Sequence, residues 1–113
     1  MRKMISASVF VPVQNASLTL GQHIRAARQS RGWTMAETAD RSLMSLATYK
    51  RIEAGDPSVA SGFLLQVLFQ LNLLNQLVSS VAPASDELGE SLRRSMAPKS
   101  IRKPTGGRLD NDF

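Results

Sequence analysis

The sequence contains no cysteine and a single histidine, His23. The absence of cysteine excludes disulfide bonds and thiolate metal sites, and it is consistent with a protein of the reducing cytoplasm. One histidine cannot form a metal site alone, so we expect neither a metal nor a cofactor. The chain also has no glycine-rich phosphate loop and no nucleophile with a nearby base. These absences predict a protein that is not an enzyme.

Uninterrupted hydrophobic runs are missing as well. The stretch from Val59 to Val78 is rich in leucine, but its five amide side chains are too many for a helix that spans lipid. The N-terminal stretch from Met4 to Val13 contains two serines and a proline, and no convincing cleavage site follows it. We therefore expect a soluble, cytoplasmic protein without a membrane partner.

Basic residues predominate over acidic ones. Lysine and arginine number 14 against 9 for aspartate and glutamate, which gives a net charge of +5 and a sequence pI of about 10.5. A basic surface favours polyanionic partners, either nucleic acid or an acidic membrane face, although the excess can also serve solubility alone. With 113 residues, the chain has room for one domain with short arms.

Composition and periodicity divide the chain into three segments. These are an N-terminal arm at residues 1–17, a helical domain at residues 18–80 and a C-terminal segment at residues 81–113. Apolar residues alternate from Ile5 to Val13 in the period of a strand, and Pro12 would restrict that strand to an edge. Its partner would be the same strand of a second copy or a bound protein; a flexible arm is the other interpretation. The C-terminal segment combines a short helix at Asp86–Met96 with a basic, flexible tail from Pro98.

Helical periodicity and capping residues predict an all-α domain. The five expected helices are Leu20–Arg31, a second helix that begins after Thr34, Leu46–Glu53, Ser61–Leu71 and Leu73–Ser79. Thr19 is the expected N-cap of the first helix, and Gly32 is its stop signal. Thr34 and Glu37 have the spacing of a capping box, and Ser45 precedes the third helix as its N-cap.

The second and third helices have the spacing of a helix-turn-helix, because their caps Thr34 and Ser45 stand eleven residues apart. With Gly32 before the motif and residues 51–55 at its end, residues 18–79 resemble the Xre/Cro-type, phage-repressor-like DNA-binding family. The resemblance implies a five-helix, phage-repressor-like fold and a recognition helix that enters the major groove. The residues expected to face the groove are Ser45, Leu46, Ala47, Thr48, Lys50 and Arg51.

Different contacts are expected along this recognition helix. Leu46 and Ala47 cannot form hydrogen bonds to bases, but they can contact thymine methyl groups. Lys50 or Arg51 can supply contacts to guanine or to phosphate. A solvated helix face is the alternative interpretation of both cations.

The resemblance also implies an ion pair that braces the fold. Repressors of this family pair an arginine late in the first helix with a glutamate at the end of the recognition helix, and Arg28 and Glu53 occupy those places. We expect them, like the capping residues Thr34 and Glu37, to be structural. Neither Arg28 nor Glu53 is expected to contact DNA.

Two residues depart from the pattern of the family. Leu43 stands in the turn where glycine is usual, and leucine disfavours a left-handed backbone, so we expect a reshaped turn or a longer second helix. Met35 stands where the family often has a glutamine that holds a phosphate, and methionine cannot make that contact. DNA affinity would then depend on backbone amides at helix N-termini and on the arms.

The fourth and fifth helices contain more apolar side chains than a small domain can bury. One stripe suffices for a core and consists of Phe63, Val67, Leu68 and Leu71. The surplus consists of Leu64, Leu65, Phe69, Leu73, Leu74, Leu77 and Val78. A second copy would cover them, whereas burial within one copy is the other interpretation. A homodimer would place two recognition helices roughly 34 Å apart on a pseudo-palindromic site in double-stranded DNA.

Beyond the domain, residues 86–89, 92–94 and 98–103 resemble the C-terminal segment of HipB-like regulators, which are encoded beside HipA-type serine/threonine kinases. This resemblance implies a sequence-specific transcriptional repressor that autoregulates a toxin–antitoxin operon on the nucleoid. It also implies binding to the kinase toxin, whole or split. The alternative is a protein-interaction module that binds such a kinase through its apolar surface, with weak or no DNA binding, an interpretation favoured by the apolar Leu46 and Ala47.

Overall fold

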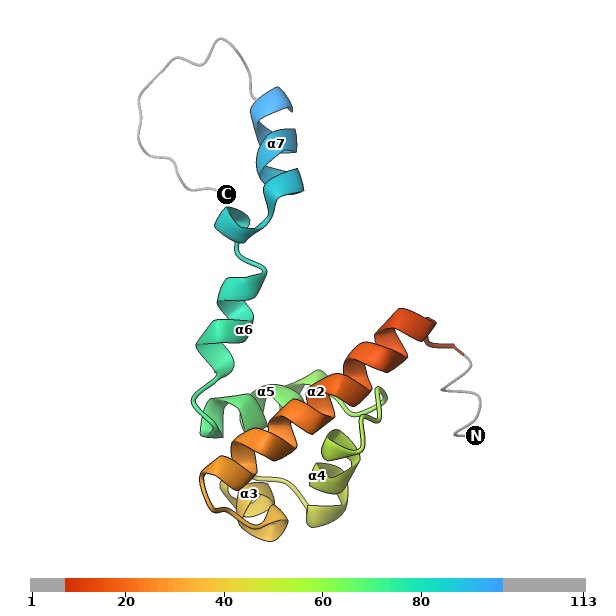
Figure 1. Ribbon diagram of the computed structural model, residues 1–113, viewed down its shortest axis with the longest axis vertical. Helices are drawn as coiled ribbons and strands as arrows, with labels where there is room; N and C mark the ends of the chain where they lie inside the picture. Colours follow the sequence, from red (N-terminus) through yellow and green to blue (C-terminus); the bar gives the residue numbers. More distant parts are fainter. Residues whose placement is uncertain (1–7, 97–113) are drawn as a thin grey trace. The chain divides into compact units, whose positions relative to one another are not determined.

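The computed structural model describes residues 8–96. These residues form six α-helices and one short 3-10 helix, and they include no strand (Figure 1). In chain order the elements are α2 (Val11–Ser30), α3 (Met35–Arg41), α4 (Leu46–Glu53), α5 (Ser61–Gln70), α6 (Leu74–Ser80), η1 (Pro83–Ser85) and α7 (Glu87–Met96). The predicted all-α class is confirmed, whereas the count of five helices is wrong.

The N-terminal arm is not a strand where the structure describes it. α2 begins at Val11 instead of Leu20, and Pro12 lies in its first turn, where a missing amide costs the helix no hydrogen bond. Thr19, the predicted N-cap, is therefore an interior residue of α2. The part of the predicted strand within residues 1–7 lies outside the described residues.

A helical face explains this longer α2. Val13, Ser17 and Leu20 recur at the spacing of helical turns, and they line an apolar groove together with Ile24. The hydroxyl of Ser17 donates to the backbone carbonyl of Gly55, which follows α4, at 2.9 Å. The alternation of apolar residues along the sequence therefore does not produce a strand here. A helix is favoured instead, because this face gains tertiary contacts that an unpaired strand lacks.

Glycine or asparagine in a left-handed conformation ends three of the helices. Gly32 follows α2 with φ of 71°, Gly55 follows α4 with φ of 78°, and Asn72 follows α5 with φ of 64°. Glycine and asparagine tolerate this conformation better than other residues, so the ends of α2, α4 and α5 are encoded locally.

The turn between α3 and α4 differs from the expectation. Leu43 itself adopts the left-handed conformation, with φ of 59°, and α3 ends at Arg41. The turn is therefore neither reshaped nor absorbed into a longer helix. The side chain of Leu43 is 81% exposed, so it contributes little packing in return for the unfavourable backbone.

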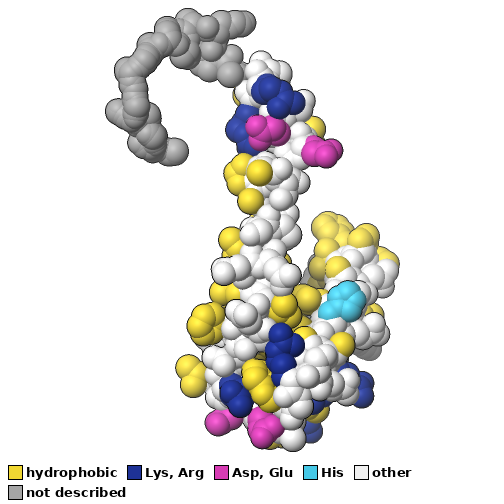
Figure 2. Space-filling model, turned by 60° about the vertical axis from the view of Figure 1, so that its left-hand side comes forward, with side chains coloured by type: hydrophobic (Ala, Val, Ile, Leu, Met, Phe, Trp, Pro, Cys, Tyr) yellow, Lys and Arg dark blue, Asp and Glu magenta, His cyan; other side chains and the backbone are white. Residues whose placement is uncertain are grey.

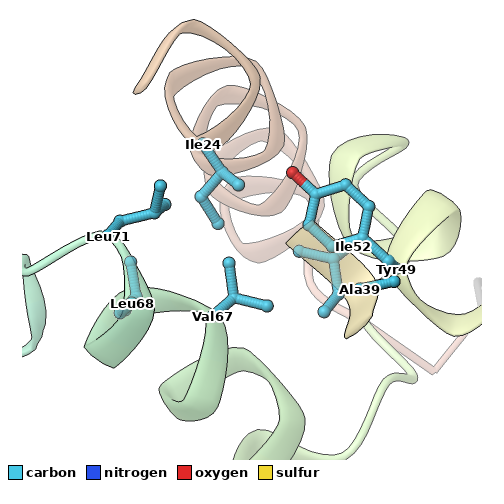
Figure 3. Packing of buried hydrophobic residues seen from close by; sticks show 7 residues of the cluster. All are labelled: Ile24, Ala39, Tyr49, Ile52, Val67, Leu68 and Leu71. Carbon is cyan, nitrogen blue, oxygen red and sulfur yellow. The ribbon is translucent and has the colours of Figure 1, made fainter. Parts of the chain in front are cut away.

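The buried core joins α2, α3, α4 and α5 (Figure 3). Its members are Ile24, Ala39, Tyr49, Ile52, Val67, Leu68 and Leu71. Phe63, predicted to belong to the core, is 37% exposed, whereas Leu64 packs against the core. The reason is helical spacing, because Leu64 and not Phe63 lies on the same face as Val67, Leu68 and Leu71. Leu73 and Leu74 also pack against this core, which reduces the apolar surplus.

The chain divides into two compact units, of which the first ends at Leu77 and the second begins at Val78. In the second unit, the carboxylate of Asp86 accepts the backbone amide of Gly89 at 3.0 Å and so caps the first turn of α7. The predicted helix at Asp86–Met96 is thus present as α7. The predicted basic tail from Pro98 lies outside the described residues.

Candidate nucleic-acid interface

The first helix of the predicted motif, α3, begins at a complete capping box. The Glu37 amide donates to the Thr34 side-chain oxygen at 3.0 Å, and the Thr34 amide donates to the Glu37 carboxylate at 2.8 Å. The hydroxyl of Thr38 also donates to the Thr34 carbonyl at 2.9 Å. These local bonds fix the point at which α3 starts and therefore the turn that leads to α4.

The second helix, α4, has one buried and one exposed face. Ser45 is its N-cap and accepts the Thr48 amide at 3.1 Å. Tyr49 and Ile52 are buried. Among the residues predicted to face DNA, Thr48 is half-buried, and the exposed ones are Ser45, Leu46, Ala47, Lys50 and Arg51. The sequence thus places a mixed apolar and cationic surface opposite the core side of the helix.

A buried ion pair fixes α4 against α2. Arg28 donates to Glu53 from Nε at 2.6 Å and from Nη2 at 3.3 Å, and its Nη1 donates to the carbonyl of Trp33 at 2.8 Å. The side chains of Arg28 and Glu53 are only 10% and 6% exposed. The phenol of Tyr49 donates to the same carboxylate. These contacts satisfy both oxygens of Glu53, as a charge removed from water requires.

The electrostatics of this cluster follow from its contacts. The hydrogen bond to Glu53 raises the pKa of Arg28. Burial and the hydrogen bond to Glu53 raise the pKa of Tyr49, because both favour its neutral phenol. Arg28 and Tyr49 therefore stay protonated across the physiological range, and the cluster is a rigid support for α4.

Close backbone packing complements the ion pair. A Cβ atom at Gly21 would lie 2.5 Å from the backbone oxygen of Glu53 and 2.7 Å from that of Ile52. Only glycine permits this approach of α2 to the end of α4. The orientation of the recognition helix is thus set by Gly21 and by Arg28, two turns apart on α2.

Arg51 is held by the loop that follows α4. Its Nε donates to the Asp56 carboxylate at 2.9 Å and its Nη2 donates to the hydroxyl of Ser58 at 2.8 Å. The hydroxyl and amide of Ser58 both donate to Asp56, and together with Arg51 they lower the pKa of this carboxyl group to about 2. The sequence-based prediction omitted Asp56 and Ser58. A signal was present, since aspartate two residues before serine is typical of an Asx-turn.

A basic groove lies beside the recognition helix. Its volume is about 390 Å³, and its lining residues are Arg25, Arg28, Met35, Lys50, Glu53 and Ala54. Arg28 and Glu53 neutralise each other, whereas Arg25 and Lys50 form no ion pair with any described residue. The groove therefore presents two cations, from two different helices, that have no ion-pair partner among the described residues. The prediction omitted Arg25 because it considered only the recognition helix.

Comparison with known proteins assigns residues 19–70 to a class of domain. Residues 19–70 match the family described as a helix-turn-helix domain. No curated protein and no solved structure matches the chain. Together with the geometry of α3 and α4, the match defines residues 19–70 as a helix-turn-helix domain. Such domains are typically non-enzymatic, and this one suggests DNA binding and transcriptional regulation.

Within residues 8–96, no helix combines the length and the apolar character needed to cross a membrane. The same residues contain no group of three or more histidine, aspartate or glutamate side chains that could hold a metal ion.

Proposed function

We propose that this protein is a sequence-specific transcriptional repressor that inserts α4 into the major groove of double-stranded DNA. The observation that carries the proposal is the exposed face of α4, held in one orientation by the buried pair of Arg28 and Glu53. A helix fixed in this way can present Ser45, Leu46, Ala47, Thr48, Lys50 and Arg51 to base edges without reorganising.

Contacts to phosphate would come from the basic groove. Arg25 on α2 and Lys50 on α4 line the same groove and have no acidic partner among the described residues. Their charges supply the sequence-independent part of the affinity that Met35 cannot supply.

We expect the Arg25→Gln variant to lose affinity for all duplexes and to reduce the slope of log affinity against log salt by about 0.9 per lost phosphate contact. The matched control is Arg94→Gln on α7.

The test of DNA binding is a gel-shift titration across the region upstream of the protein's own gene. We expect sub-micromolar binding at low salt, which weakens as salt is added.

Arg51→Ala should weaken binding and leave the thermal midpoint nearly unchanged, because its ion pair is exposed. Arg28→Ala should instead cost about 3–5 kcal/mol of stability, because Glu53 is left buried without its partner. Absence of binding at low salt contradicts the proposal.

A homodimer on a pseudo-palindromic operator is part of the proposal. Leu65 and Phe69 are one turn apart on α5, and they are 38% and 64% exposed. A second copy that covers this face would give the two-fold symmetry of a palindromic site. Yellow hydrophobic side chains are exposed on the face drawn in Figure 2.

The finer proposal is a HipB-like antitoxin component that autoregulates its operon on the nucleoid and binds a HipA-type kinase, whole or split. Its support is the resemblance of residues 86–103 to such regulators. The exposed apolar side chains of α7, namely Leu88, Leu92 and Met96, favour contact with a protein partner. The test is co-purification with the product of the neighbouring gene, with Leu92→Glu as the variant expected to abolish it. Co-purification without any DNA binding would favour the alternative, a protein-interaction module.

A further inference from the structure

Arg51 is the residue of the recognition helix whose cationic group is already held before any ligand binds. Nε bonds to Oδ2 of Asp56 at 2.9 Å, and Nη2 bonds to Oγ of Ser58 at 2.8 Å. The Ser58 hydroxyl donates in turn to Oδ1 of Asp56 at 2.7 Å, and the Ser58 amide donates to the same oxygen at 2.9 Å. Because these two acceptors are bonded to each other, they lie along one edge of the guanidinium.

The adjacent edge of the guanidinium has no partner among the described residues. The group has five N–H donors in a rigid plane, of which Asp56 and Ser58 occupy one on Nε and one on Nη2. The remaining fork consists of Nη1 and the second hydrogen of Nη2. No described residue accepts from this fork, and the Arg51 side chain is 48% exposed. Two parallel donors of this kind match N7 and O6 of guanine in the major groove.

We infer that Asp56 and Ser58 are positioning residues that hold Arg51 for a bidentate contact with guanine in double-stranded DNA. The inference rests on the proposed DNA-binding function and adds the base that this part of the site recognises. Holding the guanidinium beforehand removes part of the side-chain entropy that a free arginine loses at an interface. It also restricts the fork to one direction, which discriminates against bases that offer a donor there.

The ion pair between Arg51 and Asp56 can also oppose DNA binding, and an experiment can separate this effect from the positioning of Arg51. A carboxylate beside the groove repels phosphates, and it competes with DNA for the arginine. If repulsion prevailed, removing the charge of Asp56 would strengthen binding to every duplex. If positioning prevails, removing it weakens the preference for guanine at one base pair.

The experiment uses the full chain and a random-sequence duplex DNA library to define the bound site. Competition binding then compares that duplex with derivatives in which each G·C pair is replaced by A·T. For wild type we expect a preference of roughly tenfold or more for guanine at one position of each half-site. Arg51→Lys and Asp56→Asn should both reduce the preference at that same position to below about threefold, because lysine has no fork and the released arginine has no fixed direction.

Variants of Ser58 and a distant ion pair supply the controls. Ser58→Ala should reduce the guanine preference in part, and Ser58→Thr, which keeps the hydroxyl, should restore it. Glu90→Gln breaks an exposed ion pair with Arg93 of 2.7 Å in α7 and should leave the preference unchanged. Thermal midpoints measured in parallel detect a merely structural role, which would move the midpoint and not the base preference.

The outcomes separate the inference from the function on which it rests. A wild-type chain that enriches no sequence and binds no duplex overturns the DNA-binding function, and the inference falls with it. A wild-type chain that prefers guanine while Asp56→Asn retains the full preference overturns the inference alone. Tighter binding of Asp56→Asn to all duplexes also overturns it, and assigns Asp56 to repulsion instead.

Discussion

At the scale of the residue, Leu43 occupies a position that its chemistry disfavours. A left-handed backbone costs a residue with a Cβ atom roughly 1–2 kcal/mol relative to glycine. With its side chain 81% exposed, Leu43 recovers little of that cost through packing. The turn persists because the capped start of α3, the N-cap of α4 and the buried core fix the two helices on either side.

We expect Leu43→Gly to stabilise the protein. The gain in the free energy of unfolding should be roughly 0.5–1 kcal/mol, since glycine relieves the left-handed strain but makes the unfolded chain more flexible. Urea denaturation followed by circular dichroism measures it. The matched control is Gly32→Ala, where φ is 71° and nothing lies within 4 Å of the added Cβ, so a comparable loss is expected. A destabilised Leu43→Gly variant would show that the exposed leucine makes contacts that outweigh the strain.

Asp56 gives the protein a specific dependence on pH. Its pKa is lowered to about 2 in the folded state, from 3.8, by Ser58 and Arg51. A lowered folded pKa means that the contribution to stability is present above the unfolded value and is lost as pH falls toward the folded one. The thermal midpoint of Asp56→Asn should thus lie a few degrees at most below wild type at pH 7. The difference should shrink as pH falls from about 4 through about 2, and a difference that is constant with pH would refute the ion pair as its source.

At the scale of the element, the recognition helix α4 is oriented by its contact with α2. The contact has two parts, a close backbone approach at Gly21 and the buried ion pair of Arg28 with Glu53. The N-terminal half of α2 adds the bond from Ser17 to Gly55 at the end of α4. One long helix therefore holds the recognition helix at several points.

Gly21→Ala should be destabilising although alanine is the better helix former. Its Cβ would lie 2.5 Å from a backbone oxygen of Glu53, and backbone cannot move aside as a flexible side chain can. We expect a loss of about 1–3 kcal/mol in the free energy of unfolding and weaker DNA binding, as α4 is displaced. Gly62→Ala on α5 is the matched control, because nothing lies within 4 Å of its added Cβ. Equal stability of the two variants would mean that α2 and α4 do not pack this closely.

Helix ends were predictable from sequence to the extent that they are local. The capping box of Thr34 and Glu37, the N-cap Ser45 and the glycine Gly32 act through bonds and dihedral angles within a few residues. The start of α2 was not predictable in this way. It depends on Gly55, which is far along the chain from the residues that contact it, so alternating apolar residues suggested a strand instead.

At the scale of the whole molecule, the balance of buried and exposed apolar groups bears on assembly. Leu64, Leu73 and Leu74, counted from the sequence as surplus, pack against the core of a single copy. Phe69 remains 64% exposed and Leu65 38% exposed on α5. Leu77 and Val78 on α6 also remain exposed, at 39% and 58%. The apolar surface available for a second copy is therefore narrower than the sequence implied, but it is not confined to α5.

We expect Phe69→Glu to convert a dimer into a monomer without unfolding it. A charge at the centre of an apolar interface would be buried without a partner, whereas in the monomer it faces water. Light scattering coupled to size-exclusion chromatography measures the mass, and circular dichroism verifies the fold. Leu43→Gly, which also removes an exposed apolar side chain, should retain the oligomeric state of wild type. A dimer that survives Phe69→Glu would exclude this face as the interface.

The sequence by itself determined the helical class and the caps that delimit α3 and α4, because these follow from short-range spacing. The pairing of Arg28 with Glu53, 25 residues apart, was implied only by the resemblance to the phage-repressor-like family. The tertiary structure decided which apolar residues form the core, how far α2 extends, and that Arg51 is held by Asp56 and Ser58. Each of these depends on the direction in which a helix turns its face toward another segment. That direction is fixed only when the helices pack against one another, because packing brings together residues that lie far apart along the chain.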